Sequence, residues 1–436
     1  MTGARKILGS GASLPKVVKA TLLVIFFACA VVMIGRRNFS FLQGTDFPHF
    51  YCASRILLDG QGGKLYDSAL QYRYQAEYAG RVGTLYNHPP FEAALYLTVS
   101  WLPLSNAYLL WTFLNVLLLA IAARTLAETA LPAWKWQMLM VATLTFVPLL
   151  LCLIQGQDSI MLLLLMTLAY AAFLREQHFS AGCWLALGLF KFQVVLPVIL
   201  VLLLAPSGIR KRALASGFAA VALALMALSA VISGWSVFLT YPEFVLHLPA
   251  QRFAGIIPTA MANFRGLIYM LFHRAQPASA IAVLCLLSVA ALMATLNDWR
   301  SVRVAPDLQP GQARDSFDLA FSATAIFSLL VSYHLNPHDL TLLLLPFSLT
   351  LHRLIAEKTP PMNASSLSPS FSRPLRWATF SLLAILFLPP LHLLALTAHL
   401  FAYAYLAIPL ALLLAAVGFT LRTCKTPEIA LHIDHC

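Results

Sequence analysis

Long apolar runs occupy most of this chain, and they restrict its possible folds more than any other feature. Each run approaches the roughly 17 to 25 residues that an α-helix needs to cross a hydrocarbon layer about 30 Å thick. Of the 436 residues, 60% are hydrophobic and only 11% are charged, which is far more apolar than a soluble globular domain. The sequence therefore predicts an all-α integral membrane protein with a single membrane-embedded domain, residues 1–436.

The basic residues between the apolar runs predict about 12 crossings with both termini in the cytoplasm. The first run follows four basic residues and has no small-residue cleavage motif, so we expect an uncleaved signal anchor. Residues 181–205 are expected to enter and return as two short helices, broken near Lys191 and Pro197. The other spans are expected at about 18–35, 106–124, 137–154, 159–174, 213–235, 277–297, 317–334, 339–355, 376–396 and 400–421.

Three segments between or beyond the spans are expected to have their own character. The first loop, 36–105, faces away from the cytoplasm, and its apolar segment Phe91–Leu102 is too short to span and is predicted to be interfacial or re-entrant. The Ser- and Pro-rich segment 359–376 reads as a cytoplasmic linker, and 423–436 as a cytoplasmic tail. The net charge is +12, but the basic residues are scattered over short loops instead of forming one patch. This distribution is explained by membrane topology rather than by binding to nucleic acid.

Polar residues interrupt the apolar chain at points that this topology places on the extracytoplasmic face. They are Asp46 with His49, His88, Gln155-Gly-Gln-Asp158, Asn263 with Arg265, and His334-Leu-Asn-Pro-His-Asp339. Polar groups at membrane depth are costly unless they are paired or hydrated, so their clustering predicts a functional site. Lys191 would lie at a helix break.

Each of these residues also has a purely structural interpretation. Asp46 could be a solvated loop acid or could cap a helix that begins near Pro48. Asp158 could cap the helix after a tight turn, and Lys191 could extend its ammonium group to the membrane surface. The polar residues of 334–339 could simply close a turn between helices.

A metal site is a further possibility, because His334, His338 and Asp339 carry imidazole and carboxylate ligands. No other cluster in the sequence completes such a site. We therefore expect neither a metal ion nor another cofactor.

The order of several short motifs resembles glycosyltransferase family 87. The motifs are Gly44-Thr-Asp-Phe-Pro-His-Phe-Tyr51, Ala53-Ser-Arg-Ile-Leu-Leu-Asp-Gly60, Leu65-Tyr-Asp67, Tyr86-Asn-His-Pro-Pro90 and Gly156-Gln157, within a resemblance that covers most of Thr45 to Pro346. It implies a multi-spanning fold of the GT-C type, with a large first extracytoplasmic loop that carries the catalytic acid. It also implies sugar transfer from a polyprenyl phosphate without a metal. The sequence departs from the family where Phe192-Gln193 follows Lys191, a position at which Lys-Pro is typical.

Such a reaction assigns roles to the polar residues. A carboxylate that takes the acceptor hydroxyl proton acts as general base, which is the role expected for Asp46. The departing phosphate needs cations or hydrogen-bond donors, and these are expected among Arg265, His334, His338 and Lys191. A single base favours direct displacement with inversion. Residues expected to bind substrate are His49, His88, Gln157, Asn263 and Asp339.

The leading hypothesis is therefore a hexosyltransferase of the plasma (inner) membrane, mannosyl by family analogy. Its donor would be a polyprenyl-phosphate-linked sugar, and its acceptor a lipid or cell-envelope glycan on the extracytoplasmic side. One alternative is a transporter or lipid flippase that uses broken helices around Lys191. Another is a polyprenyl-diphosphate-dependent glycan ligase or polymerase, which would tolerate the loss of Asp46.

Overall fold

A computed structural model describes residues 39–131, 134–206, 208–248, 255–272, 278–302, 310–356, 372–398 and 402–423. Within these ranges every regular element is a helix, in agreement with the predicted all-α class. The predicted first span, most of the 359–376 linker and nearly all of the 423–436 tail lie outside the described residues.

The α-helices vary from four residues to 26. In chain order the α-helices are α2 (Phe47–Leu58), α3 (Ser68–Ala79), α4 (Pro90–Leu95), α5 (Leu97–Ser100), α6 (Leu104–Thr129), α7 (Trp136–Thr143), α8 (Val147–Gln155), α9 (Ser159–Leu174), α10 (His178–Leu187), α11 (Phe192–Leu204), α12 (Lys211–Ser233), α13 (Val237–His247), α14 (Phe264–Leu271), α15 (Ala278–Trp299), α16 (Pro310–Val331), α17 (Leu344–Ala356), α18 (Arg373–Phe387), α19 (Pro389–Thr397) and α20 (Ala407–Thr423). The 3₁₀ helices are η1 (Phe39–Gly44), η2 (Gly62–Lys64), η3 (Gly188–Lys191), η5 (Pro258–Ala260), η6 (Pro337–Leu343) and η7 (Tyr403–Leu406).

Five helical segments of the described residues are long and apolar enough to cross a membrane. They are Leu104–Thr129, His178–Leu204, Lys211–Ser233, Ala278–Trp299 and Tyr403–Arg422. The number rises to seven if each of two bent pairs is one span, namely α7 with α8 (bent by 77°) and α18 with α19 (bent by 47°). These segments support a helical membrane protein, whereas the total of about 12 spans and the sidedness stay predictions.

The segment around Lys191 differs from the prediction. The sequence predicts that residues 181–205 enter and return as two short helices, but His178–Leu204 is a single candidate span. In it α10 passes through the 3₁₀ turn η3 into α11, and Pro197 lies inside α11. A short 3₁₀ turn tightens the helix without reversing it, so the polar and proline residues here do not produce a hairpin.

The described residues form two compact units. Unit 1 takes its described residues from Met1–Ala171, Cys183–Lys191 and Phe218–Ile256, and unit 2 takes them from Ala172–Gly182, Phe192–Gly217 and Ile257–Cys436.

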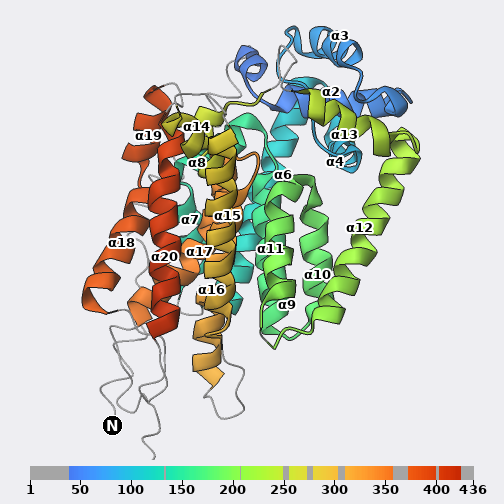
Figure 1. The fold of residues 1–436 in the computed structure, drawn as a ribbon. Helices are drawn as coiled ribbons and strands as arrows, with labels where there is room; N and C mark the ends of the chain where they lie inside the picture. Colours follow the sequence, from blue (N-terminus) through green and yellow to red (C-terminus); the bar gives the residue numbers. More distant parts are fainter. Residues whose placement is uncertain are drawn as a thin grey trace, which may run out of the picture. The chain divides into compact units, whose positions relative to one another are not determined.

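In unit 1, α2 packs against α3, α4, α5 and α6. Figure 1 shows α2, α3 and α4 gathered together in blue. Helix α2 is buried on nearly all sides, as expected of a helix enclosed by its neighbours. Its aromatic side chains fill the core of this unit, for example where Phe50 stacks on Tyr96 with ring centroids 4.7 Å apart. The loop predicted to be extracytoplasmic is therefore a folded layer, and Asp46 lies at its first long helix.

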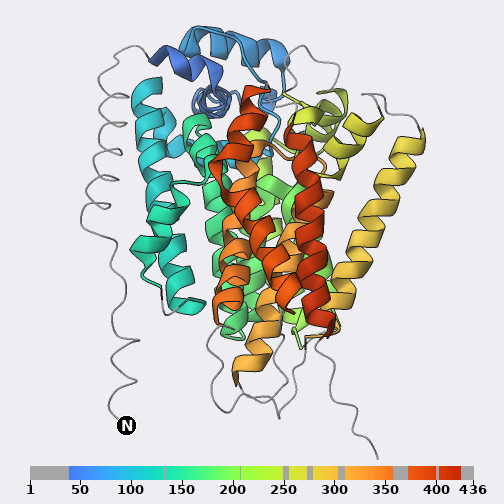
Figure 2. The ribbon, with the colours of Figure 1, turned by 90° about the vertical axis from the view of Figure 1, so that its left-hand side faces the viewer.

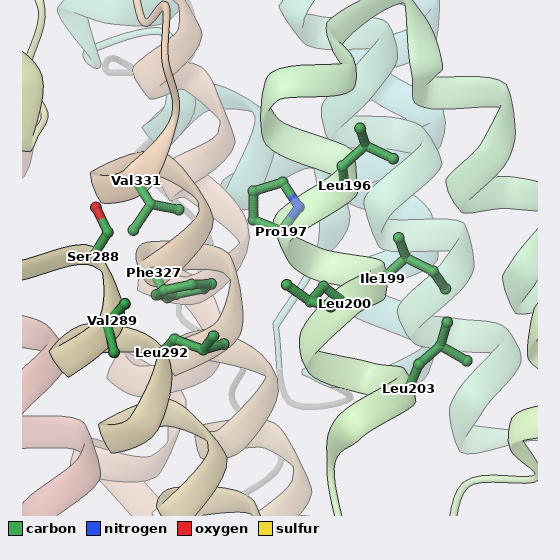
Figure 3. A pocket seen from close by; sticks show the side chains of 10 residues that line it. All are labelled: Leu196, Pro197, Ile199, Leu200, Leu203, Ser288, Val289, Leu292, Phe327 and Val331. Atoms are coloured by element: carbon green, nitrogen blue, oxygen red, sulfur yellow. The ribbon is translucent and has the colours of Figure 1, made fainter. Parts of the chain in front are cut away.

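In unit 2, α16 packs against α11, α15, α17 and α20, and α18 packs along α20. Figure 2 shows α18 and α20 side by side in orange and red. A mostly apolar groove of about 550 Å³ lies between α11, α15 and α16 (Figure 3). Its lining residues are Leu196, Pro197, Ile199, Leu200, Leu203, Ser288, Val289, Leu292, Phe327 and Val331. Two of them, Leu196 and Val289, are 46% and 58% exposed, so the groove has an open apolar rim.

Candidate active site

Asp46 occupies the N-cap position of α2, but its side chain does not cap the helix. Instead its Oδ2 accepts a hydrogen bond of 2.7 Å from Nε2 of Gln157. The backbone N–H of Asp46 donates to Oε1 of Gln155 at 2.9 Å. Both partners lie more than 100 residues further along the chain. The carboxylate is therefore held by a distant part of unit 1 rather than used to start its own helix.

The turn that supplies these partners, Gln155–Asp158 (the Gly156 turn), is fixed by packing and by backbone conformation. Helix α8 ends at Gln155 and is capped by Gly156, whose φ of +65° favours glycine. A Cβ at this position would lie 2.8 Å from Cβ of Phe47, so glycine is also required by space. The carbonyl of Gly156 accepts hydrogen bonds from Trp111 Nε1 (2.9 Å) and Tyr96 Oη (3.3 Å). These contacts keep Gln157 facing Asp46.

The ionisation of Tyr96 suits its role as a donor to this turn. Burial raises the pKa of Tyr96 well above its ordinary value, and the nearby carboxylates of Asp158, Glu92 and Asp46 raise it further. The hydroxyl therefore stays protonated and can donate to Gly156.

Lys191, the last residue of η3, is buried with a charged partner. Its Nζ lies 3.1 Å from Oδ1 of Asp158 and 3.5 Å from Oε1 of Gln157, to which it donates. Lys191 and Gln157 are each 2% exposed and Asp158 is 0% exposed. Lys191 thus does not reach the surface, and neither oxygen of Asp158 accepts a hydrogen bond from α9. The two opposite charges compensate each other, which lowers the cost of burying them.

His49 and His88 form a second group in unit 1. Their rings are nearly parallel, with centroids 6.0 Å apart, and Nδ1 of His88 lies 2.9 Å from Oε2 of Glu92. Glu92 is fully buried in α4 and was not predicted as a site residue. The sequence did contain an indication of this role. Glu92 is the only acid of the apolar segment Phe91–Leu102, and it follows His88 by four residues, the spacing of helical neighbours.

Unit 2 brings together the remaining predicted residues, which with their neighbours we name the His334 cluster (Asn263, Arg265 and 332–339). Asn263 caps α14 through Gly266 N–H at 2.8 Å and donates to the carbonyl of Ser332 at 2.7 Å. Arg265 donates to the carbonyl of Tyr333 at 2.9 Å, and its guanidinium carbon lies 4.0 Å from the centroid of the Tyr333 ring. Sequence reasoning missed Tyr333, whose exposed ring gave no local signal.

Short-range contacts run through the rest of the cluster. Asn336 Nδ2 lies 3.2 Å from Nε2 of His334, and the backbone N–H of Asn336 donates to Oδ2 of Asp339 at 2.8 Å. His338 Nε2 lies 3.6 Å from Oδ1 of Asp339. In the part of the chain that the structure describes, no group of three or more His, Cys, Asp or Glu residues is arranged to hold a metal ion.

The structure therefore joins Asp46, Gln157 and Lys191 in one network and His49 with His88 in a pair, both within unit 1. Asn263, Arg265, His334, His338 and Asp339 belong to the His334 cluster of unit 2. That all of these residues serve one reaction stays a prediction.

Comparison with known proteins identifies one family. A family model described as glycosyltransferase family 87 matches residues 86–332, more than half of the chain. This confirms the resemblance seen in the sequence motifs. No curated protein matches the chain. The matched range includes Gln157 and Lys191 but begins after Asp46. Hydrogen bonds with Gln155 and Gln157 connect Asp46 to the matched region.

Proposed function

Because the chain belongs to glycosyltransferase family 87, we propose that it transfers a sugar from a polyprenyl phosphate to a lipid or cell-envelope glycan, with Asp46 as the general base. One observation carries this proposal: Gln157, inside the family match, holds the carboxylate of Asp46 outside it. Asp46 is only partly buried, whereas Gln157 is enclosed. A base needs this combination, a fixed carboxylate that an acceptor can still approach.

The proposed step is a single displacement. The acceptor hydroxyl oxygen attacks the anomeric carbon as the bond from that carbon to the phosphate oxygen breaks. Asp46 accepts the hydroxyl proton, and the phosphate leaves with the bonding electron pair. Among the described residues no hydrogen-bond partner of Oδ1 of Asp46 is found, so this oxygen is suited to receive the proton. Inversion follows because no covalent intermediate with an enzyme nucleophile is formed.

The departing phosphate would be stabilised by groups of the His334 cluster. Arg265 is the strongest candidate, because contact with Tyr333 orients its guanidinium while using only part of its donors. Arginine stays charged and matches phosphate with paired donors. We propose that His334 and His338 assist Arg265, and that His49, His88, Asn263 and Asp339 contact the sugar or the acceptor.

A lipid-linked donor is supported by the groove of unit 2. An isoprenoid chain needs an apolar surface within the membrane, and the groove provides one that is lined by α11 and α15, both in candidate spans, and by α16 (Figure 3). Its volume is within the approximately 300–1,000 Å³ of ligand-sized pockets. We propose hexose transfer, with mannose as the first sugar to test, on the extracytoplasmic side of the plasma membrane.

Sugar transfer in membranes that contain the wild type or Asp46→Asn tests the proposal. Radiolabelled polyprenyl phosphate sugars serve as donors, and a native lipid extract serves as the source of acceptor. Product in the wild type with little in a normally folded variant supports the proposal, and equal product assigns the base elsewhere. The absence of product with every donor contradicts it. Transport assays on the same membranes test the transporter alternative, which rests on the helix interruption η3 at Lys191.

A further inference from the structure

The network of unit 1 extends beyond Asp46 into groups that the proposed reaction does not use. Gln157 lies between two charged side chains, with Nε2 donating to Asp46 at 2.7 Å and Oε1 accepting from Lys191 at 3.5 Å. A side-chain amide has one donor end and one acceptor end. The cation on one side and the carboxylate on the other therefore favour the same orientation of the amide.

The opposite orientation would be unfavourable at both ends. It would point the amide oxygen at the carboxylate of Asp46 and the NH₂ group at the ammonium of Lys191. The amide oxygen would then repel the carboxylate of Asp46 instead of the NH₂ group attracting it. Because the amide is buried, this repulsion would be stronger than in water. The charge of Lys191 thus determines which end of Gln157 Asp46 meets.

Asp158 keeps that charge in place. Its carboxylate is fully buried and lies 3.1 Å from the ammonium, so it compensates a cation that would otherwise be costly at this depth. The same short turn supplies Asp158, Gln157 and, through Gln155, the acceptor for the backbone N–H of Asp46.

We propose that Asp158, Lys191 and Gln157 form a positioning relay that holds the Asp46 carboxylate in place for the acceptor hydroxyl. Lys191 acts through Gln157 and does not itself contact the donor phosphate. The relay rests on the proposed function, in which Asp46 is the base. It differs from the phosphate contact predicted for Lys191 from the sequence, and the two roles have different kinetic consequences.

The test removes both buried charges together, because Lys191→Met alone would leave Asp158 unpaired and could prevent folding. The pair variant is Lys191→Met with Asp158→Asn, and it is compared with Gln157→Ala and with the triple variant. Arg124→Met with Glu128→Gln is the matched control, because it removes an ion pair from the exposed surface of α6. Initial rates are measured in proteoliposomes over a range of concentrations of a polyprenyl phosphate sugar donor.

The relay predicts that kcat falls about 10- to 100-fold in the pair variant, the usual effect of losing a hydrogen bond to a charged group. The KM for the donor should change less than about twofold, since the phosphate contacts are untouched. The triple variant should be no slower than Gln157→Ala, because Lys191 acts only through Gln157. A raised donor KM with unchanged kcat would overturn the relay in favour of a phosphate contact. Independent losses that multiply, or no loss at all, would also overturn it.

Failure of the proposed function gives a different pattern. Activity that disappears in Asp46→Asn but persists in the relay variants overturns the relay alone. If the wild type transfers no sugar, the proposed function fails and the relay loses its catalytic purpose. Thermal unfolding of the same variants in detergent then still tests the physical coupling: losses of Tm that are smaller together than their sum support it, and additive losses contradict it.

Discussion

The Gly156 turn of unit 1 and the His334 cluster of unit 2 look alike in sequence, since both place amide and carboxylate side chains between apolar helices. Their contacts differ. Gln155 and Gln157 reach Asp46 more than 100 residues away, and Lys191 joins from 34 residues away. In the His334 cluster the long-range bonds come from Asn263 and Arg265, which donate to backbone carbonyls. The polar groups of its turn meet mainly each other, since Asn336 contacts His334 and Asp339, two and three residues away. Contacts between near neighbours are explained by the closing of a turn. The contacts of the Gly156 turn instead fix distant segments of unit 1 against each other.

The largest expected effect distinguishes an acid that acts as general base from an acid that only caps a helix. Asp46→Asn should lower kcat by about 10²- to 10⁴-fold, because asparagine keeps the shape but cannot accept the proton. Asp67→Asn is the control, since Asp67 caps α3 through Leu70 N–H and asparagine caps equally well. Transfer assays on normally folded protein measure both. Equal losses in the two variants would mean that Asp46 has no special role.

The next effect tests the His334 cluster. Arg265→Gln should raise the KM for the donor about tenfold or more, because a charge-assisted contact with phosphate is lost. Tyr333→Phe is the control, since it keeps the carbonyl and the ring that orient Arg265. Steady-state kinetics with varied donor measures both. An unchanged KM in Arg265→Gln would leave this residue with a structural role only.

A smaller effect concerns the geometry of the Gly156 turn. Gly156→Ala should destabilise the protein by more than the roughly 1–2 kcal/mol that a left-handed conformation costs an L-residue, because the new methyl group would also meet Phe47. Gly60→Ala isolates the conformational part, since Gly60 has φ of +68° with open space around it. Thermal unfolding compares the two variants. Equal losses of Tm would show that contact with Phe47 does not constrain the turn.

The smallest effect tests the apolar groove. Ser288→Trp places a large side chain in its lining and should slow transfer from a long-chain donor a few-fold more than transfer from a short-chain donor. Val231→Trp, at an 82% exposed position of α12, is the control. The ratio of the two rates is the measurement. If Ser288→Trp changes neither rate, the prenyl chain does not occupy the groove.

Several features followed from the sequence alone. Apolar runs predicted a helical membrane protein, because the length of such runs and the scarcity of charge are local properties. The order of short motifs identified the family. The interruptions of the apolar pattern indicated Asp46, the Gly156 turn and Lys191 as candidate site residues, because polar groups are costly at membrane depth unless they are paired or hydrated.

Only the tertiary structure decided how these residues are used. Nothing near Asp46 in sequence indicates that its partner is Gln157, because that hydrogen bond depends on α2 packing against the end of α8, more than 100 residues away. Likewise, the sequence around Lys191 predicted a break at which the chain returns, yet α10, η3 and α11 form one candidate span. The ammonium of Lys191 lies beside Asp158 inside the protein. Local sequence determines where polar groups interrupt the apolar chain, and packing determines which of them meet.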